Sequence, residues 1–491
     1  MRPSRAGQLR RALLAGALAL AFMAPAATSA QEPAAPPVLS WDTGTGKSYL
    51  IPALEVGGFI FGLNQFNRHF IDPKEDYDTD AATFWKNLST TPVYDKDPFS
   101  VNQIGHPYQG SLYHGFARSA GVEYWESLLY TIGGSFLWET YGETTPPSIN
   151  DHIATGIGGS FVGEAMFRMA GLLLEGGGDR PGFWRELGAA VISPPTGFNR
   201  LAFGDRFKTI FPSRDPEIFS HLRLGATLTA DVTNEGLSKD VTRQQGSAEY
   251  SITYGLPGKP GYRYRRPFDY FHFELTAVPN ASTTSNAIEN ASIRGLLAGA
   301  TYEWGAAYRG VWGLFGGYDY LSPQIFRIAT TNVFLGSVAQ WWLSRAVALQ
   351  GTALGGLGFG AAGTVDDRAE RDYHFGLIPQ TFLGLRLIFG DRAMLEATGR
   401  QYLVAGTGSG HGASTSDIGA EVIARGNVGF TVRLYGPHAI GIHYLVTSRD
   451  ARLTHLRDRH QSVETVSLSY NFLGHTHFGA VEWRHGETGR H

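Results

Sequence analysis

The stretch from Asn102 to Arg168 holds the densest group of residues that could carry chemistry. Histidines, carboxylates and two arginines stand there within segments that are otherwise mostly apolar. A glutamate or aspartate in such a setting could act as a general base, with a histidine as its acid or hydrogen-bond partner. The candidate residues for a catalytic or ligand site are His106, His114, Arg118, Glu126, Glu139, Glu143, Asn150, Asp151, Glu164 and Arg168.

The same residues also have a structural explanation, in which they only hold the fold together. Glu164 and Arg168 are four residues apart, the spacing of an ordinary ion pair on one helix face. Asp151 follows Ser148 by three residues, the spacing of a capping box at a helix start. Polar clusters of this kind occur in structural networks as well as in active sites, so both explanations remain open.

Metal, cofactor and phosphate sites are not expected. His106, His114 and His152 with a glutamate are a weak metal candidate, because no His-x-x-x-His or His-Glu-x-x-His spacing organises them. The sequence has no Gly-x-Ser-x-Gly nucleophile elbow and no phosphate-binding loop. We therefore predict no cofactor and no bound metal.

Helices are expected to position the candidate residues. Pro146 and Pro147 separate two of these helices, since proline cannot continue a helix. Gly159 and Gly163 form a small-x-x-x-small pair, which lets two helix backbones approach closely. We predict a compact helical hairpin with its polar side chains pointing inward. The predicted helices cover residues 48–70, 81–87, 122–141, 149–174 and 182–191. The residues predicted to share a helix face are Glu139 with Glu143, and Asn150 with Ile157, Glu164 and Arg168.

The chain changes its period near residue 200, from helical spacing to the alternation of β-strands. From Leu222 to Val232, apolar residues alternate with polar ones over about the 9–11 residues that a tilted membrane strand requires. Roughly twelve such segments lie between 217 and 485, and the last of them is expected to end near Trp483. The predicted fold is α+β: a small N-terminal helical module followed by a C-terminal antiparallel transmembrane β-barrel of about twelve strands.

Charged residues fall on the polar phase of the predicted strands and would face the barrel lumen. Both signs are present, so they could line a narrow pore or form a salt-bridge plug without a transport role. The lumen-facing candidates are Arg223, Glu249, Glu274, Arg386, Arg400, Glu421, Arg425 and Arg433.

The first thirty residues resemble a secretory signal peptide. Four arginines precede a short apolar run, and small residues follow it, so we expect cleavage after Ala30. Removing this leader would leave 37 basic and 44 acidic residues, a net charge of −7, which argues against nucleic acid as a partner. We expect a linker at 31–47, the helical module at 48–200 and the barrel at 215–491. The absence of cysteine excludes disulfides as a source of stability.

A series of short motifs resembles an uncharacterised bacterial family, the domain of unknown function 3943. The motifs occur in the family's order and cover about a third of the chain. They are Gly105–Tyr108, Gly110–Tyr113, Arg118, Trp125–Ser127, Trp138-Glu139, Gly142-Glu143, Pro147–Asp151, Gly163-Glu164, Arg168 and the turn Phe198-Asn199-Arg200. The resemblance implies an exported outer-membrane protein, and it brings no activity with it.

These observations favour an outer-membrane β-barrel protein that acts as a narrow pore, a binder or an envelope scaffold. One alternative is a membrane enzyme that acts on lipid or cell-wall material through the Glu/His/Asp cluster of the helical module. Another is a soluble periplasmic β-protein. The expected partners are outer-membrane lipid, the barrel assembly machinery and a small-molecule or lipid ligand.

Overall fold

A computed structural model describes residues 36–95, 97–234, 244–278, 287–365, 370–408, 419–454 and 458–484. The predicted leader and its cleavage site after Ala30 lie outside these residues. The chain forms two units. The helical unit comprises the residues up to Asp95 and Ile104–Ser213, and the barrel unit comprises Lys96–Gln103 and the residues from Arg214 onward. Each unit is described by itself below.

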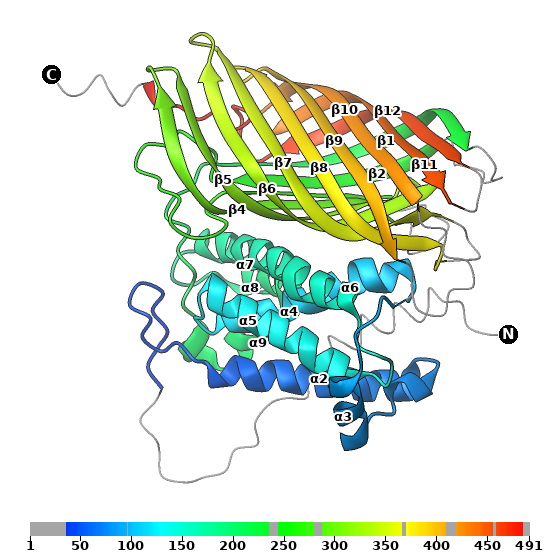
Figure 1. The fold of residues 1–491 in the computed structure, drawn as a ribbon. Coiled ribbons are helices and arrows are strands. Elements are labelled where there is room, and N and C mark those ends of the chain that lie inside the picture. Colours follow the sequence, from blue (N-terminus) through cyan, green and yellow to red (C-terminus); the bar gives the residue numbers. More distant parts are fainter. Residues whose placement is uncertain are drawn as a thin grey trace. The chain divides into compact units, whose positions relative to one another are not determined.

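The helical unit contains all five predicted helices, with ends that differ by a few residues, and two helices that the sequence pattern does not predict. The unpredicted ones are α4 (His106–Ser119) and α9 (Pro194–Ala202). The other helical elements are α2 (Leu50–Phe70), η2 (Lys74–Tyr77), α3 (Ala81–Ser89), α5 (Tyr124–Leu137), η4 (Trp138–Gly142), α6 (Ile149–Asp151), η5 (His152–Gly158), α7 (Gly159–Glu175), α8 (Phe183–Ile192) and η6 (Gly204–Phe207) (Figure 1). A π-helical turn, η3 (Val101–Gly105), precedes α4.

Helix α4 is the centre of the helical unit, since twelve of its fourteen residues are buried. Its backbone approaches α7 very closely. A Cβ atom on Gly159 would lie 2.6 Å from the Cα of Gly110, and one on Gly163 would lie 2.8 Å from the Cβ of His114. The close helix contact predicted from Gly159 and Gly163 is therefore confirmed, and α4 is the partner.

Replacing Gly159 by alanine is expected to destabilise the helical unit by about 1–3 kcal/mol or more, because overpacking shifts the backbone. The added Cβ would lie 2.6 Å from the Cα of Gly110. Gly133→Ala is the matched control, since nothing lies within 4 Å of a Cβ there and alanine favours a helix. Thermal unfolding in detergent, followed by circular dichroism, measures both variants. Equal melting temperatures would contradict the close packing.

Two predicted side-chain placements are wrong because parts of the helices are π-helical or end early. Residues Ile149–Glu175 form one continuous helical stretch, but its η5 part is a π-helix, whose wider turns rotate the following face. Asn150, Glu164 and Arg168 are buried as predicted, whereas Ile157 is 39% exposed. Glu143 does not share a helix face with Glu139, because it is extended (φ −136°, ψ 154°) beyond the helix end.

The barrel unit is a closed antiparallel barrel of twelve strands, which confirms the predicted fold class (Figure 1). Each strand pairs with its neighbours in sequence, and β1 also pairs with β12 to close the sheet. The strands are β1 (Ile218–Asn234), β2 (Gln244–Tyr254), β3 (Phe271–Ala277), β4 (Ile288–Trp304), β5 (Tyr308–Leu321), β6 (Phe326–Trp342), β7 (Val347–Thr364), β8 (Tyr373–Phe389), β9 (Ala393–Gly408), β10 (Gly419–Tyr435), β11 (His438–Leu453) and β12 (Arg459–Leu473).

The two rims of the barrel differ in their connections. One rim, here called the lower rim, carries the short turns at 305–307, 343–346, 390–392 and 436–437, and β1 begins and β12 ends there. The opposite rim is called the upper rim. The prediction that the last strand ends near Trp483 is wrong, because β12 ends at Leu473. The segment after it folds back into the lumen.

The outer surface of the barrel is apolar, and charged and polar side chains lie inside it. Leu222, Leu224 and Leu228 of β1 are exposed, while Arg223 between them is buried. The same alternation holds on β12, where Leu468, Tyr470 and Phe472 are exposed and Ser469 and Asn471 are buried. This polarity is opposite to that of a soluble β-protein and is that of an outer-membrane barrel.

Candidate functional site

The first buried polar cluster of the helical unit surrounds Glu164 of α7. Arg118 of α4 donates two hydrogen bonds to its carboxylate, from Nε at 2.7 Å and from Nη2 at 3.2 Å. Arg168 donates from Nε at 2.8 Å, and His114 Nε2 lies 3.2 Å from Oε2. All four side chains are buried. The carboxylate is paired with two guanidinium groups, and these contacts tie α4 to α7.

The second cluster surrounds the start of α6. Ser148 caps this helix, accepting a hydrogen bond from the Asp151 backbone N–H at 3.2 Å, as the sequence predicts. Glu139 accepts from the Ser148 backbone N–H at 2.7 Å, so it completes the capping arrangement in place of Asp151. Asp151 lies 3.5 Å from His106 Nε2 and accepts from Asn150 Nδ2 at 2.9 Å.

The two remaining candidates of the helical unit lie elsewhere. Glu126 forms an ion pair with Lys47 at 2.6 Å and accepts a hydrogen bond from the hydroxyl of Tyr49. Glu143 accepts from the indole N–H of Trp138 at 2.8 Å. The ten predicted residues thus divide into two buried clusters and two separate contacts. Their contacts favour structural roles over the general-base chemistry considered for them.

No group of three or more histidines, aspartates or glutamates is arranged to hold a metal ion within the described part of the chain. His106 lies in the second cluster, His114 lies in the first, and His152 contacts Ser135. The weak metal candidate of the sequence therefore does not assemble as one site.

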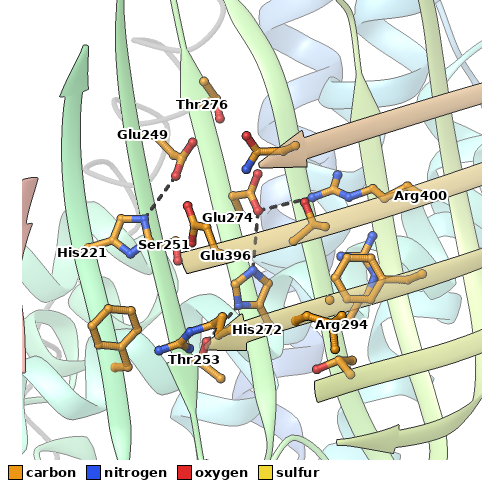
Figure 2. A pocket seen from close by; sticks show the side chains of 18 of the residues that line it. His221, Glu249, Ser251, Thr253, His272, Glu274, Thr276, Arg294, Glu396 and Arg400 are labelled. Carbon is orange, nitrogen blue, oxygen red and sulfur yellow. Dashed lines mark hydrogen bonds and ion pairs between the residues drawn. The ribbon is translucent and has the colours of Figure 1, made fainter. Parts of the chain in front are cut away.

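The second candidate site is a cavity of about 160 Å³ in the barrel lumen (Figure 2). Six predicted lumen residues line it, namely Arg223, Glu249, Glu274, Arg386, Arg400 and Arg425. The two others lie apart from it. Glu421 is bound by Arg449 closer to the upper rim, and Arg433 pairs with Asp391 in a turn of the lower rim.

Ion pairs cross the lumen between strands on different sides of the barrel. Arg223 of β1 donates to Glu249 of β2 at 2.8 Å and to Glu396 of β9 at 2.7 Å. Arg400 of β9 donates to Glu274 of β3 at 3.3 Å, across the barrel from it. Arg425 of β10 reaches Glu289 of β4 at 3.4 Å. These pairs divide the lumen and leave it narrow.

Several lining residues were not among the predicted candidates. Arg294 and Glu396 occupy the inward phase of their strands, so the same alternation would have found them. Three histidines also line the cavity. His221 lies 3.2 Å from Glu249, and His272 lies 3.6 Å from Glu274 (Figure 2). Neither ring nitrogen of the third, His443, makes a hydrogen bond to a described residue. His443 Nδ1 lies 3.5 Å from Glu396.

Other polar atoms of the cavity residues also make no hydrogen bond to a described residue, namely Nε of Arg294, Nε of Arg386, Oγ1 of Thr276 and Oε1 of Gln350. Buried donors without partners are costly, because their desolvation is not compensated. A small solute with acceptor groups would compensate them.

A segment after the last strand, Gly474–Trp483, closes the lumen at the lower rim and is here called the C-terminal seal. Phe478, Val481 and Trp483 are buried in an apolar cluster with residues of the barrel wall, including Phe219 and Met394. These side chains fill the lower end of the lumen.

Two glutamines of the barrel wall hold the C-terminal seal. Gln340 accepts from the Val481 backbone N–H at 2.8 Å and donates to the Val481 carbonyl at 2.7 Å. Gln350 donates to the carbonyl of Gly479 at 2.8 Å. The seal is thus held by side chains rather than by a strand ladder.

The lumen is also filled between the cavity and the upper rim. An apolar layer there includes Leu321, Ile325 and Tyr402. Beyond it, Arg449 donates to Glu421 at 2.6 Å and, across the barrel, to Thr364 at 2.8 Å. The polar cavity therefore lies between two filled layers, and the described conformation has no wide passage through its described residues.

Comparison with solved structures gives matches to outer-membrane proteins at low identity and low TM-score. The Pseudomonas putida toluene transporter TodX shares 10% identity and a TM-score of 0.21, over 53% of this chain and 90% of that one. The outer membrane channel DcaP of Acinetobacter baumannii shares 9% identity and a TM-score of 0.23, over 52% and 96%. The KdgM porin shares 8% identity and a TM-score of 0.21, over 51% and 98%. At these values the likeness says nothing about a substrate.

A family model matches the part of the sequence that holds the motifs of the helical unit. No curated protein matches the chain. Residues 91–195, which include both buried clusters of the helical unit, match the family described as "Domain of unknown function (DUF3943)", and over this region the chain resembles that family.

Proposed function

We propose that this protein is a narrow outer-membrane channel, closed in the described conformation, whose lumen cavity binds small polar solutes. The observation that carries the proposal is the lumen cavity, which is lined by charged side chains of both signs and lies between two filled layers. A lumen that served only as a structural plug would be expected to be filled throughout, as protein interiors are.

The C-terminal seal is the element best suited to open. Its backbone is held in part by the amide side chains of Gln340 and Gln350, whereas the wall of the barrel is held by continuous strand ladders. Displacing the seal would therefore leave the barrel intact. The filled layer near the upper rim would have to rearrange as well for a solute to pass.

The proposal also includes how the protein reaches the outer membrane. We infer that the leader is removed after Ala30, that the barrel assembly machinery inserts the barrel, and that outer-membrane lipid surrounds its apolar outer face. The polarity of the barrel supports this location, because an apolar exterior requires lipid.

Single-channel recording in planar bilayers tests the function. The wild-type protein is expected to show rare openings, and the double variant Gln340→Ala, Gln350→Ala should open roughly tenfold to a hundredfold more often. The reason is that it removes buried hydrogen bonds to the seal that contribute about 1 kcal/mol each. Gln380→Ala is the matched control, since Gln380 is a buried lumen residue of β8 with no described bond to the seal.

Two outcomes would overturn the proposal. If the double variant folds, as shown by heat-modifiable migration, and stays as closed as Gln380→Ala, then the seal is not a gate. If the wild-type protein conducts continuously, then the closed conformation is not the state in the membrane.

A further inference from the structure

The helical unit combines buried ionic groups with apolar side chains on its surface. Its interior contains the ionic cluster of Glu164, Arg118 and Arg168, while several of its helices present apolar side chains on their exposed faces. Large exposed apolar patches mark an interaction surface. Ionisable groups that are paired and turned inward are the arrangement found in membrane-embedded helices.

Helix α2 shows this combination over most of its length. Leu50, Leu54 and Phe61 lie on its exposed side, and Leu54 is 63% exposed. Between Leu50 and Gln65 the only charged residue is Glu55, which is buried. The helix has 21 residues, a length of about 30 Å at 1.5 Å per residue, which matches the hydrocarbon thickness of a bilayer.

Helix α5 has the same character. Trp125, Leu129, Ile132 and Phe136 are exposed, and no charged residue occurs between Ser127 and Trp138. The ion pair of Glu126 with Lys47 lies at the start of this helix, outside the apolar stretch. The continuous helix Ile149–Glu175 is also long and apolar enough to cross a membrane, by length and composition alone.

The segment that links the two parts of the helical unit in sequence lies on the outer wall of the barrel. Phe99 of this segment is buried against Tyr320 and Tyr373, with ring centroids 6.0 and 5.4 Å apart. Both tyrosines occupy the outward phase of their strands, opposite to the lumen residue Asp319. This segment therefore runs along the outside of the barrel near the upper rim, where Arg327 and Glu370 also contact it.

We propose that the helical unit is embedded in the outer membrane and that lipid acyl chains cover the exposed apolar faces of α2 and α5. The occupant is lipid because α2, whose one charged residue between Leu50 and Gln65 is the buried Glu55, matches the bilayer in length. The chain of the helical unit also passes directly into the segment that runs along the outside of the barrel. A soluble module at the membrane surface would carry charges on these faces.

Spin labels test the proposal, because the chain has no cysteine and each label can be placed alone. Leu54→Cys and Leu129→Cys report on the two faces. Leu335→Cys on the exposed face of β6 is the lipid control, and Asp179→Cys on an exposed loop is the water control. The labelled full-length proteins are placed in phospholipid vesicles, and relaxation by oxygen and by a water-soluble nickel chelate is compared.

Labels at Leu54 and Leu129 are expected to respond like the label at Leu335, with strong relaxation by oxygen and weak relaxation by nickel. A response like that of Asp179 would place the faces in water and overturn the proposal. Weak relaxation by both reagents would show that protein covers the faces, a second copy for example, and would overturn it equally.

Discussion

Replacing Glu164 by glutamine is expected to destabilise the helical unit by roughly 3–5 kcal/mol, the cost of breaking a buried ion pair from one side. The amide keeps the shape of the side chain, but Arg118 and Arg168 lose the carboxylate that lies between them and face each other as like charges. Denaturant unfolding of the full chain in detergent, with hydrogen exchange of peptides from α4 and α7, measures the loss.

Two further variants separate the ion pair from a general effect of mutation. Glu186→Gln breaks the pair with Arg200, in which the glutamate side chain is 37% exposed, so the loss should stay below about 1 kcal/mol. Glu164→Gln combined with Arg168→Met should recover part of the stability, because one uncompensated charge is removed. A stable or stabilised single variant would contradict the structural role and would favour a functional one, since active sites often reduce stability.

The barrel could be predicted from the sequence because each strand carries its own signal. Alternation with period two needs only neighbouring residues, and the length of the alternating segments separates membrane strands from ordinary ones. The same alternation placed Arg223 and Glu274 in the lumen. It failed for Arg433, which lies near a strand end, where the turn residue Asp391 captures its side chain.

Helix α4 could not be predicted because it has no apolar face. It is surrounded by other elements and carries His106, His114 and Arg118 on buried positions, so the hydrophobic period of a surface helix is missing. Helix recognition depends on that period. The π-helical segments could not be predicted either. They rotate the helix face that follows them, but they do not change the amino-acid composition of the segment.

The partners of the candidate residues also could not be predicted. Arg400 meets Glu274 because β9 and β3 lie across the barrel from each other, a relation that depends on the closed strand order rather than on local sequence. The C-terminal seal was missed for a related reason. Phe478, Val481 and Trp483 are apolar like strand residues, and only the end of β12 at Leu473 shows that they enter the lumen.

Replacing Arg223 by methionine is expected to destabilise the barrel by roughly 3–5 kcal/mol. The guanidinium joins Glu249, Glu396 and the side-chain oxygen of Asn471, so its loss leaves two buried carboxylates without this cation. The temperature at which the folded band converts to the unfolded band in semi-native electrophoresis should fall accordingly. Arg433→Met is the matched control, since its partner Asp391 is 44% exposed and the pair should contribute less than about 1 kcal/mol.

The direction of the Arg223 result decides between the two explanations of the lumen charges. A large loss of stability means that the main role of the ion pairs across the lumen is to stabilise the barrel. Solutes would then pass only through the space between these pairs. A gain in stability would mean that the arginine is kept at a cost to the fold, as residues of binding sites often are. In that case Arg223 itself would belong to the solute site, and its substitution should change the ion selectivity of the opened channel more than its stability.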